Sequence, residues 1–479
     1  MFCSEITTNP GIVLNSDKMS FFIRGKAGGK PGGKPKDKVK KNFPPAEQKF
    51  LGKRKKFEDE EVESDEEILS NDEDLPAAES SEDELETPQE KRLRLAKKYL
   101  EEIEKEEQKR AEEGNSAANV DKRLTNEYLD SVGKLRRFVA GSYLGVEEDR
   151  IQMLKHKSQK APVTCLCLSR DGKWLFSGSK SPAIVKWSVE DWRPMGVISL
   201  LDRGQENGKK VKVQGVCLTI TSDGKFLAVA DGSAGIRVYC PESLGSLGVL
   251  RAHRKPVTAL VARKDTHEIY SGSSDKTVIV WSLDEMAKIE VMFGHQATVT
   301  DLDALTRDRA ISSGGNDCSI RIWKVSEESQ LVYNGHSGNI DSVRLINEEN
   351  FLSCGDDGSL CVWSTMKKKP LCVQALAHGK SPENNEANWI SAIATYTNTD
   401  LVASGSCDGF IRVWKLESHF RKCVKIMEIP VPGFVNALTF TPDGNHLIAA
   451  LGQEHRLGRW WRIAQAKNCI AVIPFRRKT

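Results

Sequence analysis

Residues 252–281 read AHRKPVTALVARKDTHEIYSGSSDKTVIVW. This stretch begins with a histidine in a turn, continues with two short runs and a Ser-Gly-Ser-x-Asp turn, and ends with a third run that closes on tryptophan. Related stretches return at 294–323, at 335–363 and, with an insertion, at 378–414. Self-similarity at a spacing of roughly 40 to 45 residues is typical of four-stranded blades arranged in a ring. The chain is therefore predicted to contain a β-propeller.

Weaker copies extend the repeat in both directions. In the first copy His156, Ser177 and Trp187 fit the pattern, but Ser181 stands where Asp is expected. The second copy has Ser233 at the Asp position and Tyr239 in place of tryptophan, and the last begins near Gly433, with Glu454 at the Asp position relative to Trp460. We therefore expect an all-β, seven-bladed propeller over residues 151–479. Its ring would close through a strand at 151–154, through one at 469–475, or through both.

The Gly-His start and Trp finish of the repeat resemble the WD40 family. In that family a His, a Ser, an Asp and a Trp of each blade form a buried hydrogen-bonded set. The resemblance assigns this role to His253, Ser271, Asp275 and Trp281; to His295, Ser313, Asp317 and Trp323; to His336, Ser353, Asp357 and Trp363; and to His378, Ser404, Asp408 and Trp414. His, Ser and Asp also form catalytic triads, but an active site occurs once, whereas this set recurs. No enzyme is predicted.

The composition limits the other classes of function. Twelve cysteines are present, none of them in a Cys-x-x-Cys pair, so neither a metal site nor a disulfide scaffold is predicted. Reduced, buried thiols fit a nuclear or cytosolic protein. No apolar run approaches the roughly 18 residues that span a bilayer, so no membrane partner is expected. No motif indicates a cofactor.

Residues 1–86 are predicted to be a disordered, charged tail, and whether residues 1–18 are translated is left open by Met19. Residues 24–56 are rich in Gly, Pro and Lys, and residues 58–86 hold sixteen acidic residues and no basic one. Two clusters indicate a bipartite nuclear localisation signal or a nucleic-acid-binding tail, with an ordinary solvated linker as the alternative. They are Lys36, Lys38, Lys40 and Lys41, followed by Lys53, Arg54, Lys55 and Lys56.

A helical segment is predicted over residues 87–140. Thr87 followed by Pro88 and Glu90 is a helix start, and the first helix is expected to reach about residue 111. A second helix is expected over residues 119–139. Each helix has a narrow apolar stripe, which suits docking either on the propeller or on a partner.

Basic residues gather in the loops of one propeller face. The loop with the blade His and the turn with the blade Asp must share a face, because the two side chains hydrogen-bond to each other. On that face we define a basic arc over blades seven, one, two and three, comprising Lys155, Lys157, Lys160, Lys209, Lys210, Lys212, Arg251, Arg254, Lys255, Arg456 and Arg459. Clustered Lys and Arg favour contact with an RNA backbone. The alternative is that these are ordinary solvated loops.

Three stretches narrow the resemblance. PQEKRLRLAKKYLEEIE before the propeller, LVYNGHSGNIDSVRLINEENFLSCGDDGS in blade five and GQEHRLGRWWRI near the end are similar to the U3 small nucleolar RNA-interacting protein family. The resemblance implies a nucleolar, non-enzymatic scaffold that binds the box B/C region of U3 small nucleolar RNA beside the box C/D core proteins, including fibrillarin. It also implies membership of the small-subunit processome, which processes precursor ribosomal RNA towards 18S RNA. The competing interpretation is a nuclear WD40 adaptor that binds only proteins.

Overall fold

The structure is a computed structural model. It describes residues 94, 97–99, 101–103, 123–125, 127–129, 136–203, 210–212, 215–381, 385–417, 419–458 and 461–478. All of them belong to the second of two compact units, Leu85–Thr479. The two predicted basic clusters of the tail, at 36–41 and 53–56, and the acidic block at 58–86 lie outside the described residues.

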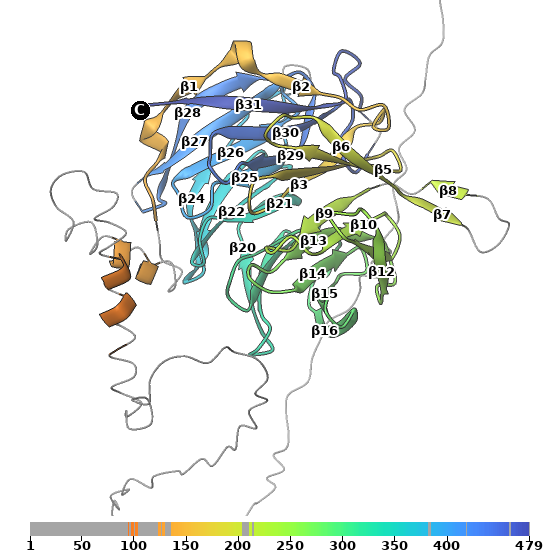
Figure 1. Cartoon of the computed structure of the whole chain (residues 1–479). Helices are drawn as coiled ribbons and strands as arrows, with labels where there is room; N and C mark the ends of the chain where they lie inside the picture. The colour runs from red at the N-terminus through yellow and green to blue at the C-terminus, as the bar shows by residue number, and fades with distance from the viewer. Residues whose placement is uncertain are drawn as a thin grey trace, which may run out of the picture. The chain divides into compact units, whose positions relative to one another are not determined.

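Seven antiparallel sheets form the blades, and the predicted seven-bladed propeller is confirmed (Figure 1). Blade one is β3 (Val163–Leu168), β4 (Trp174–Ser179), β5 (Ala183–Ser188) and β6 (Pro194–Ser199); blade two is β9 (Cys217–Ile220), β10 (Leu227–Ala230), β11 (Gly235–Tyr239) and β12 (Ser246–Arg251); blade three is β13 (Val257–Ala262), β14 (Glu268–Ser273), β15 (Thr277–Ser282) and β16 (Ala287–Phe293). A two-stranded hairpin, β7 (Leu201–Arg203) and β8 (Lys210–Lys212), connects blades one and two.

The remaining blades continue the ring. Blade four is β17 (Val299–Ala304), β18 (Arg309–Gly314), β19 (Ser319–Lys324) and β20 (Ser329–Asn334); blade five is β21 (Ile340–Leu345), β22 (Asn350–Gly355), β23 (Leu360–Ser364) and β24 (Lys367–Gln374); blade six is β25 (Ile390–Thr395), β26 (Leu401–Ser406), β27 (Phe410–Glu417) and β28 (Lys422–Pro430). The first strands contact one another in sequence, and β29 (Phe434–Phe440) of blade seven contacts β3 of blade one. The first strands therefore line the centre of a closed ring.

Blade seven is built from both ends of the propeller. After β29 come β30 (His446–Gly452) and β31 (Cys469–Arg477), and β31 pairs with β1 (Tyr143–Val146) and β2 (Gln152–Leu154). Both segments considered for closing the ring thus take part, together with β1, which precedes residue 151. The expected placement of Glu454 relative to Trp460 on a third strand is wrong, because β31 is the third strand. Residues 453–468 instead form a long connection before it, and Trp460 lies outside the described residues.

The core is divided among the junctions between blades. Each of the seven buried hydrophobic clusters joins two neighbouring blades. In the cluster between blades four and five, for example, Ile311 and Ile322 of blade four pack with Phe351 and Trp363 of blade five. A single four-stranded blade cannot bury both of its faces alone, so the repeated apolar strands of the sequence are satisfied only by their neighbours.

The described residues of the segment before the propeller are helical only in part. Helical turns occur at 97–99, 101–103, 123–125 and 127–129, where the Tyr99 hydroxyl donates a hydrogen bond of 2.7 Å to Glu127. The prediction of a helix up to residue 139 is wrong for residues 136–139, which lie outside any helix. The amides of Val139 and Ala140 donate to Asp400 Oδ1 of blade six, at 2.8 and 3.0 Å. If the helix continued, these two amides would bond within the helix and not to the buried Asp400 carboxylate.

A partly exposed histidine links blades two and three. His267 Nε2 lies 2.7 Å from Asp223 Oδ2, and Nδ1 lies 2.7 Å from Asp284 Oδ1. Hydrogen bonds to Asp284 and Asp223 raise the pKa of His267 above its ordinary value. The stabilisation from this pair is therefore complete below about pH 6.5 and is lost as the pH rises through the folded-state pKa.

We accordingly expect the Tm difference between the wild-type protein and the His267→Gln variant to shrink between pH 6 and pH 9. Thermal unfolding of both proteins across this range checks it. His446→Gln is the control, because burial lowers the pKa of His446, so its difference should not shrink in this way. A Tm difference between the wild-type protein and His267→Gln that stays constant from pH 6 to pH 9 would contradict the ion pairs of His267 with Asp223 and Asp284.

Two further observations concern the described residues. The eleven cysteines among them are all unpaired. No helix in this part of the chain is both long and apolar enough to cross a membrane.

Candidate nucleic-acid interface

Hydrogen bonds join the His, Ser, Asp and Trp side chains in three of the repeated blades. In blade three His253 lies 2.9 Å from Asp275 and 2.7 Å from Ser271, to which the Trp281 indole donates at 2.7 Å. The sets that begin with His336 and His378 have the same connections. Because the serine hydroxyl serves both the tryptophan and the histidine, each buried polar group has a partner. The serines of these sets are fully buried, and the sets hold the loops in place.

Blade four departs from the sequence assignment by one residue. Ser312, and not the predicted Ser313, lies 2.7 Å from His295 and accepts the Trp323 indole at 2.8 Å. The cause is the turn before Asp317, which is one residue longer than in the other blades, so counting back from Asp reaches the wrong serine. Ser313 instead lies 2.9 Å from the Thr300 hydroxyl.

Ser312 belongs to the blade set and the adjacent Ser313 does not, so alanine variants of the two serines can be compared directly. Ser312→Ala leaves the buried Trp323 N–H and the His295 ring without their partner, at a cost of about 1–3 kcal/mol in unfolding free energy. Ser313→Ala should cost less than about 1 kcal/mol, because the Thr300 hydroxyl still has the Ile340 carbonyl at 2.6 Å. Urea denaturation of the two variants checks the ranking. Equal losses would contradict the assignment.

Blade one replaces the histidine by a glutamine. Gln159 is buried, donates to the Ser177 carbonyl at 2.7 Å and lies 3.1 Å from the Ser177 hydroxyl, which also accepts the Trp187 indole. The sequence indicated His156 for this role, but its ring instead accepts the Ser158 amide at 3.2 Å. A glutamine offers both a donor and an acceptor, so it can stand in for the ring. The repeat pattern, which is keyed to histidine, missed it.

The topology places the basic arc on the face of the His loops. Lys155, Lys157 and Lys160 lie in the connection from β2 to β3, and the β7–β8 hairpin occupies the equivalent connection from β6 to β9. Arg251 is the last residue of β12, and Arg254 and Lys255 lie in the connection that follows it, from β12 to β13. The Asn468 side chain donates to the Lys160 carbonyl at 2.9 Å, so the long connection of blade seven adjoins that of blade one.

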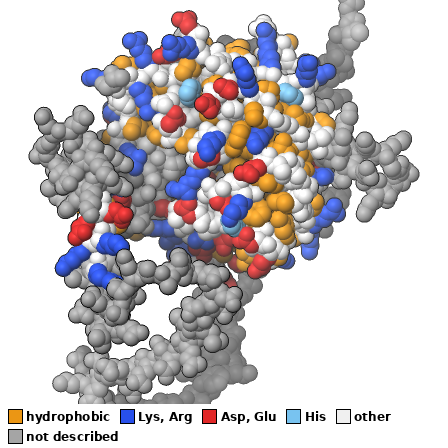
Figure 2. Space-filling model, in the orientation of Figure 1, with side chains coloured by type: hydrophobic (Ala, Val, Ile, Leu, Met, Phe, Trp, Pro, Cys, Tyr) orange, Lys and Arg blue, Asp and Glu red, His pale blue; other side chains and the backbone are white. Residues whose placement is uncertain are grey.

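Six members of the arc are exposed to solvent. They are Lys155, Lys157, Lys160, Arg251, Arg254 and Lys255. The Arg254 amide is fixed by Asp275 at 3.0 Å, so the blade-three set holds this part of the loop in place. Lys209 and Arg459 lie outside the described residues, as do the side chains of Lys210 and Lys212. In the view of Figure 2, Lys and Arg side chains are spread along the upper margin of the propeller, with acidic and apolar side chains between them.

Arg456 has a different setting from the rest of the arc. Its guanidinium donates to the Asp341 carbonyl at 2.7 Å, across the ring on the first strand of blade five. Arg456 is partly buried and reaches towards the centre of the ring, where the first strands lie, whereas the six exposed members of the arc face solvent. The sequence could not indicate this direction, because Asp341 is 115 residues away.

Lys180 is a second basic residue that the sequence did not single out. Its ammonium donates to the carbonyls of His455 and Gly458, each at 2.7 Å, and lies 3.4 Å from the Glu454 carboxylate. Its side chain is only 5% exposed. Lys180 therefore anchors the long connection of blade seven to blade one and does not offer its charge to a ligand.

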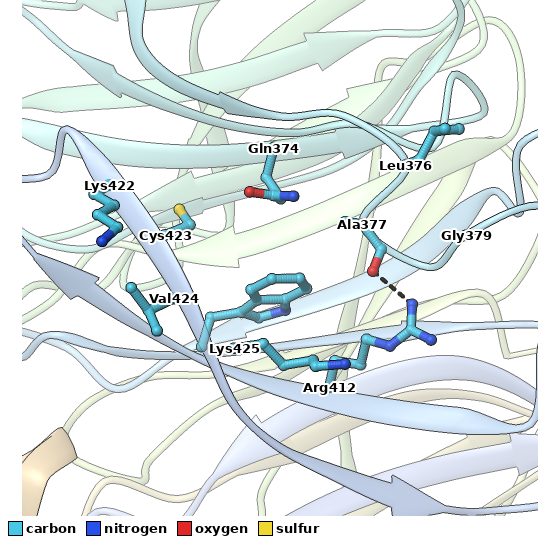
Figure 3. A pocket seen from close by; sticks show the side chains of 10 residues that line it. Gln374, Leu376, Ala377, Gly379, Arg412, Lys422, Cys423, Val424 and Lys425 are labelled. Carbon is cyan, nitrogen blue, oxygen red and sulfur yellow. Dashed lines mark hydrogen bonds between the residues drawn. The ribbon is translucent and has the colours of Figure 1, made fainter.

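A groove also lies between blades five and six (Figure 3). It has a volume of about 540 Å³ and is lined by residues of β24, β27 and β28. Its central cation, Arg412, donates to the Ala377 carbonyl at 2.5 Å and to Glu428 at 2.7 Å. The Arg412 guanidinium is therefore engaged within the protein, at the joint between two blades.

Comparison with known proteins identifies the family. The model of the WD domain, G-beta repeat, matches residues 149–188, 244–282, 287–324, 327–364 and 378–415. Over 398 residues, covering 82% of this chain and 83% of the relative, the chain is 45% identical to U3 small nucleolar RNA-interacting protein 2 of Homo sapiens. The chain belongs to the U3 small nucleolar RNA-interacting protein family. Of the three weaker copies, blade one is matched, whereas β9–β11 of blade two and β29–β31 of blade seven lie outside the matched ranges.

Further relatives agree with this family. The solved chain described as "Structure of U3-55K" is 42% identical, with a TM-score of 0.65, and covers 69% of this chain and 100% of its own. Ribosomal RNA-processing protein 9 of Saccharomyces cerevisiae is 24% identical over 344 residues, 65% of this chain and 58% of the relative. The U3 small nucleolar RNA-interacting protein family is thus a family of U3 ribonucleoprotein-associated proteins involved in ribosomal RNA processing.

Proposed function

We propose that this chain is a non-enzymatic scaffold subunit of the U3 small nucleolar ribonucleoprotein and that it binds U3 RNA directly through the exposed members of the basic arc. The observation that carries the proposal is that six Lys and Arg side chains are exposed on one face of a propeller of this family, in or beside the β2–β3 and β12–β13 connections. These two connections flank the one that contains the β7–β8 hairpin. Lys and Arg contacts to phosphates supply affinity without sequence specificity.

The arc suits a folded RNA. Its connections follow the curve of the ring over blades one to three, so they can contact phosphates on both sides of a bent RNA. Specificity would come from the shape of the box B/C region and not from the reading of base edges. The rigid blade sets support this mode of binding, because they fix loop backbones such as that of Arg254 before the RNA arrives.

The wider role of the chain would follow from its place in the U3 small nucleolar ribonucleoprotein. Attached to U3 RNA, the chain would lie beside the box C/D core proteins, including fibrillarin, in the nucleolus. It would act within the small-subunit processome on precursor ribosomal RNA towards 18S RNA. The basic clusters at 36–41 and 53–56 would serve nuclear import.

Crosslinking and immunoprecipitation from cells tests the proposal, with the bound RNA sequenced and the crosslinked peptides mapped. Enrichment of U3 RNA with peptides from residues 155–160 and 251–255 is expected. U3 enrichment with crosslinks only in residues 24–56 would reject the arc and assign RNA contact to the tail. Absence of small nucleolar RNA would reject direct binding and favour a protein-only adaptor.

A further inference from the structure

An acidic pocket lies on the same face as the basic arc, on the other side of the central channel from blades one to three. The pocket has a volume of about 310 Å³ and lies at the mouth of the central channel, among the connections of blades four, five and six and the long connection of blade seven. Its lining includes Asn316, Asp341, Asp356, Trp389, His455 and Leu457. No Lys or Arg side chain lines it, in contrast to the arc over blades one to three.

Asp341 is the unusual member of this lining. It is only 9% exposed, and none of the described residues hydrogen-bonds to its carboxylate. Arg456 donates to the backbone carbonyl of Asp341 and not to the side chain. Burial raises the pKa of Asp341 to about 6. The neighbouring Arg456 charge opposes this rise only in part. Burial disfavours the ionised carboxylate, and a cation that reaches it from the pocket would favour it.

A second carboxylate is held beside it. Asp356 accepts a hydrogen bond of 2.8 Å from the Asn339 side chain, and its amide donates to the Asn339 carbonyl at 3.0 Å. Gly338 leaves room for this side chain, because a Cβ at that position would collide with Asp356 Oδ1. Burial raises the pKa of Asp356, and the nearby Asp357 adds to this effect. The backbone at Gly338 and Asn339 is thus shaped around the Asp356 side chain.

The other wall of the pocket is aromatic and uncharged. The rings of Trp389 and His455 lie 4.8 Å apart at 45°. Burial and the neighbouring Arg456 and Lys180 lower the pKa of His455 to about 3, so the imidazole is neutral at physiological pH. Leu457, which is 51% exposed, forms part of the rim. An indole face beside carboxylates is an environment that attracts a planar or ammonium cation.

We propose that this pocket binds an arginine or lysine side chain of a protein partner, with Asp341 and Asp356 pairing with the cation and Trp389 covering its apolar stem. The pocket is the chemical opposite of the basic arc. Carboxylates repel phosphates, so RNA is directed to one side of the face and a basic protein segment to the other. This inference goes beyond the proposed RNA binding, which does not depend on it.

The test uses the full-length chain and two blocked heptapeptides, Gly-Ser-Gly-Arg-Gly-Ser-Gly and its glutamine counterpart, followed by ligand-observed NMR. The arginine peptide is expected to bind at least about tenfold more tightly than the glutamine peptide, as one charge pair worth about 1.4 kcal/mol requires. Asp341→Asn should abolish this preference, and Asp356→Asn should reduce it. Asp191→Asn, at an exposed carboxylate in the β5–β6 turn, is the matched control and should leave the preference intact.

The outcomes are distinct. Equal binding of the two peptides by the wild-type protein, or an unchanged preference in both Asp341→Asn and Asp356→Asn, would overturn the proposal. A preference that appears only after Lys53–Lys56 are replaced by glutamine would also overturn it, because the occupant would then be the chain's own tail. Thermal unfolding shows whether each variant folds, and U3 RNA binding by the same variants separates failure of this pocket from failure of the arc.

Discussion

Replacement of Trp363 by alanine is expected to lower the free energy of unfolding by about 3–5 kcal/mol. The side chain is fully buried between blades four and five. Its ring stacks on Phe351 at 5.9 Å and meets Tyr333 edge-on at 6.0 Å, and its indole donates to Ser353 at 2.8 Å. Alanine would leave a cavity at the junction and remove one of the two hydrogen bonds that position the Ser353 hydroxyl.

The shift of the urea midpoint, with an unchanged slope, measures this loss. Met366→Ala is the control within the same blade, because its side chain is 83% exposed and should change stability by less than about 0.5 kcal/mol. A Trp363 variant as stable as the Met366 variant would show that the junction repacks without cost. That result would contradict the view that blades depend on their neighbours.

The second large effect is expected in RNA binding. Replacement of Lys155, Lys157 and Lys160 by glutamine removes three exposed charges from one connection of the arc. If each contacts a phosphate, the slope of log K against log salt should fall in magnitude by about 2. Affinity for U3 RNA at a fixed moderate salt concentration should fall at least tenfold, since the lost contacts contribute through counterion release.

A matched variant controls for total charge. Lys367, Lys368 and Lys369 are also three exposed lysines, but they follow the β23–β24 turn, on the opposite face from the His loops. Their replacement by glutamine should leave the salt slope nearly unchanged. Filter binding with purified U3 RNA over a series of salt concentrations gives both slopes. Equal slopes for the two triple variants would place the RNA contact elsewhere.

The repeat made the fold predictable from the sequence. A pattern of apolar strands that closes on Trp281, Trp323, Trp363 and Trp414 reports a local unit, and stacking such units leaves few arrangements. The closing strand was harder to predict, because β31 has no tryptophan and its partners β1 and β2 lie at the other end of the domain. Pairing between segments far apart in the chain produces no repeated spacing that could be recognised in the sequence.

The exposure of the candidate site residues was predictable only where the direction of the side chain did not matter. Exposed lysines such as Lys157 follow from their place in a connection, since the connection itself fixes the face. The inward path of Arg456 towards Asp341, the burial of Lys180 and the replacement of a histidine by Gln159 depend on contacts between blades. The Ser312 assignment failed on a single inserted residue in a turn, which alters the register but not the composition.

The construction of blade seven bears on how the protein is made. Tyr143 of β1 and Arg477 of β31 touch in the finished ring although 334 residues separate them in the chain. Six blades consist of consecutive strands and can assemble as they leave the ribosome, but β1 emerges early and must wait for β31. Throughout elongation the nascent chain therefore has an open ring with an unpaired strand edge. Closure of the ring therefore requires translation through β31.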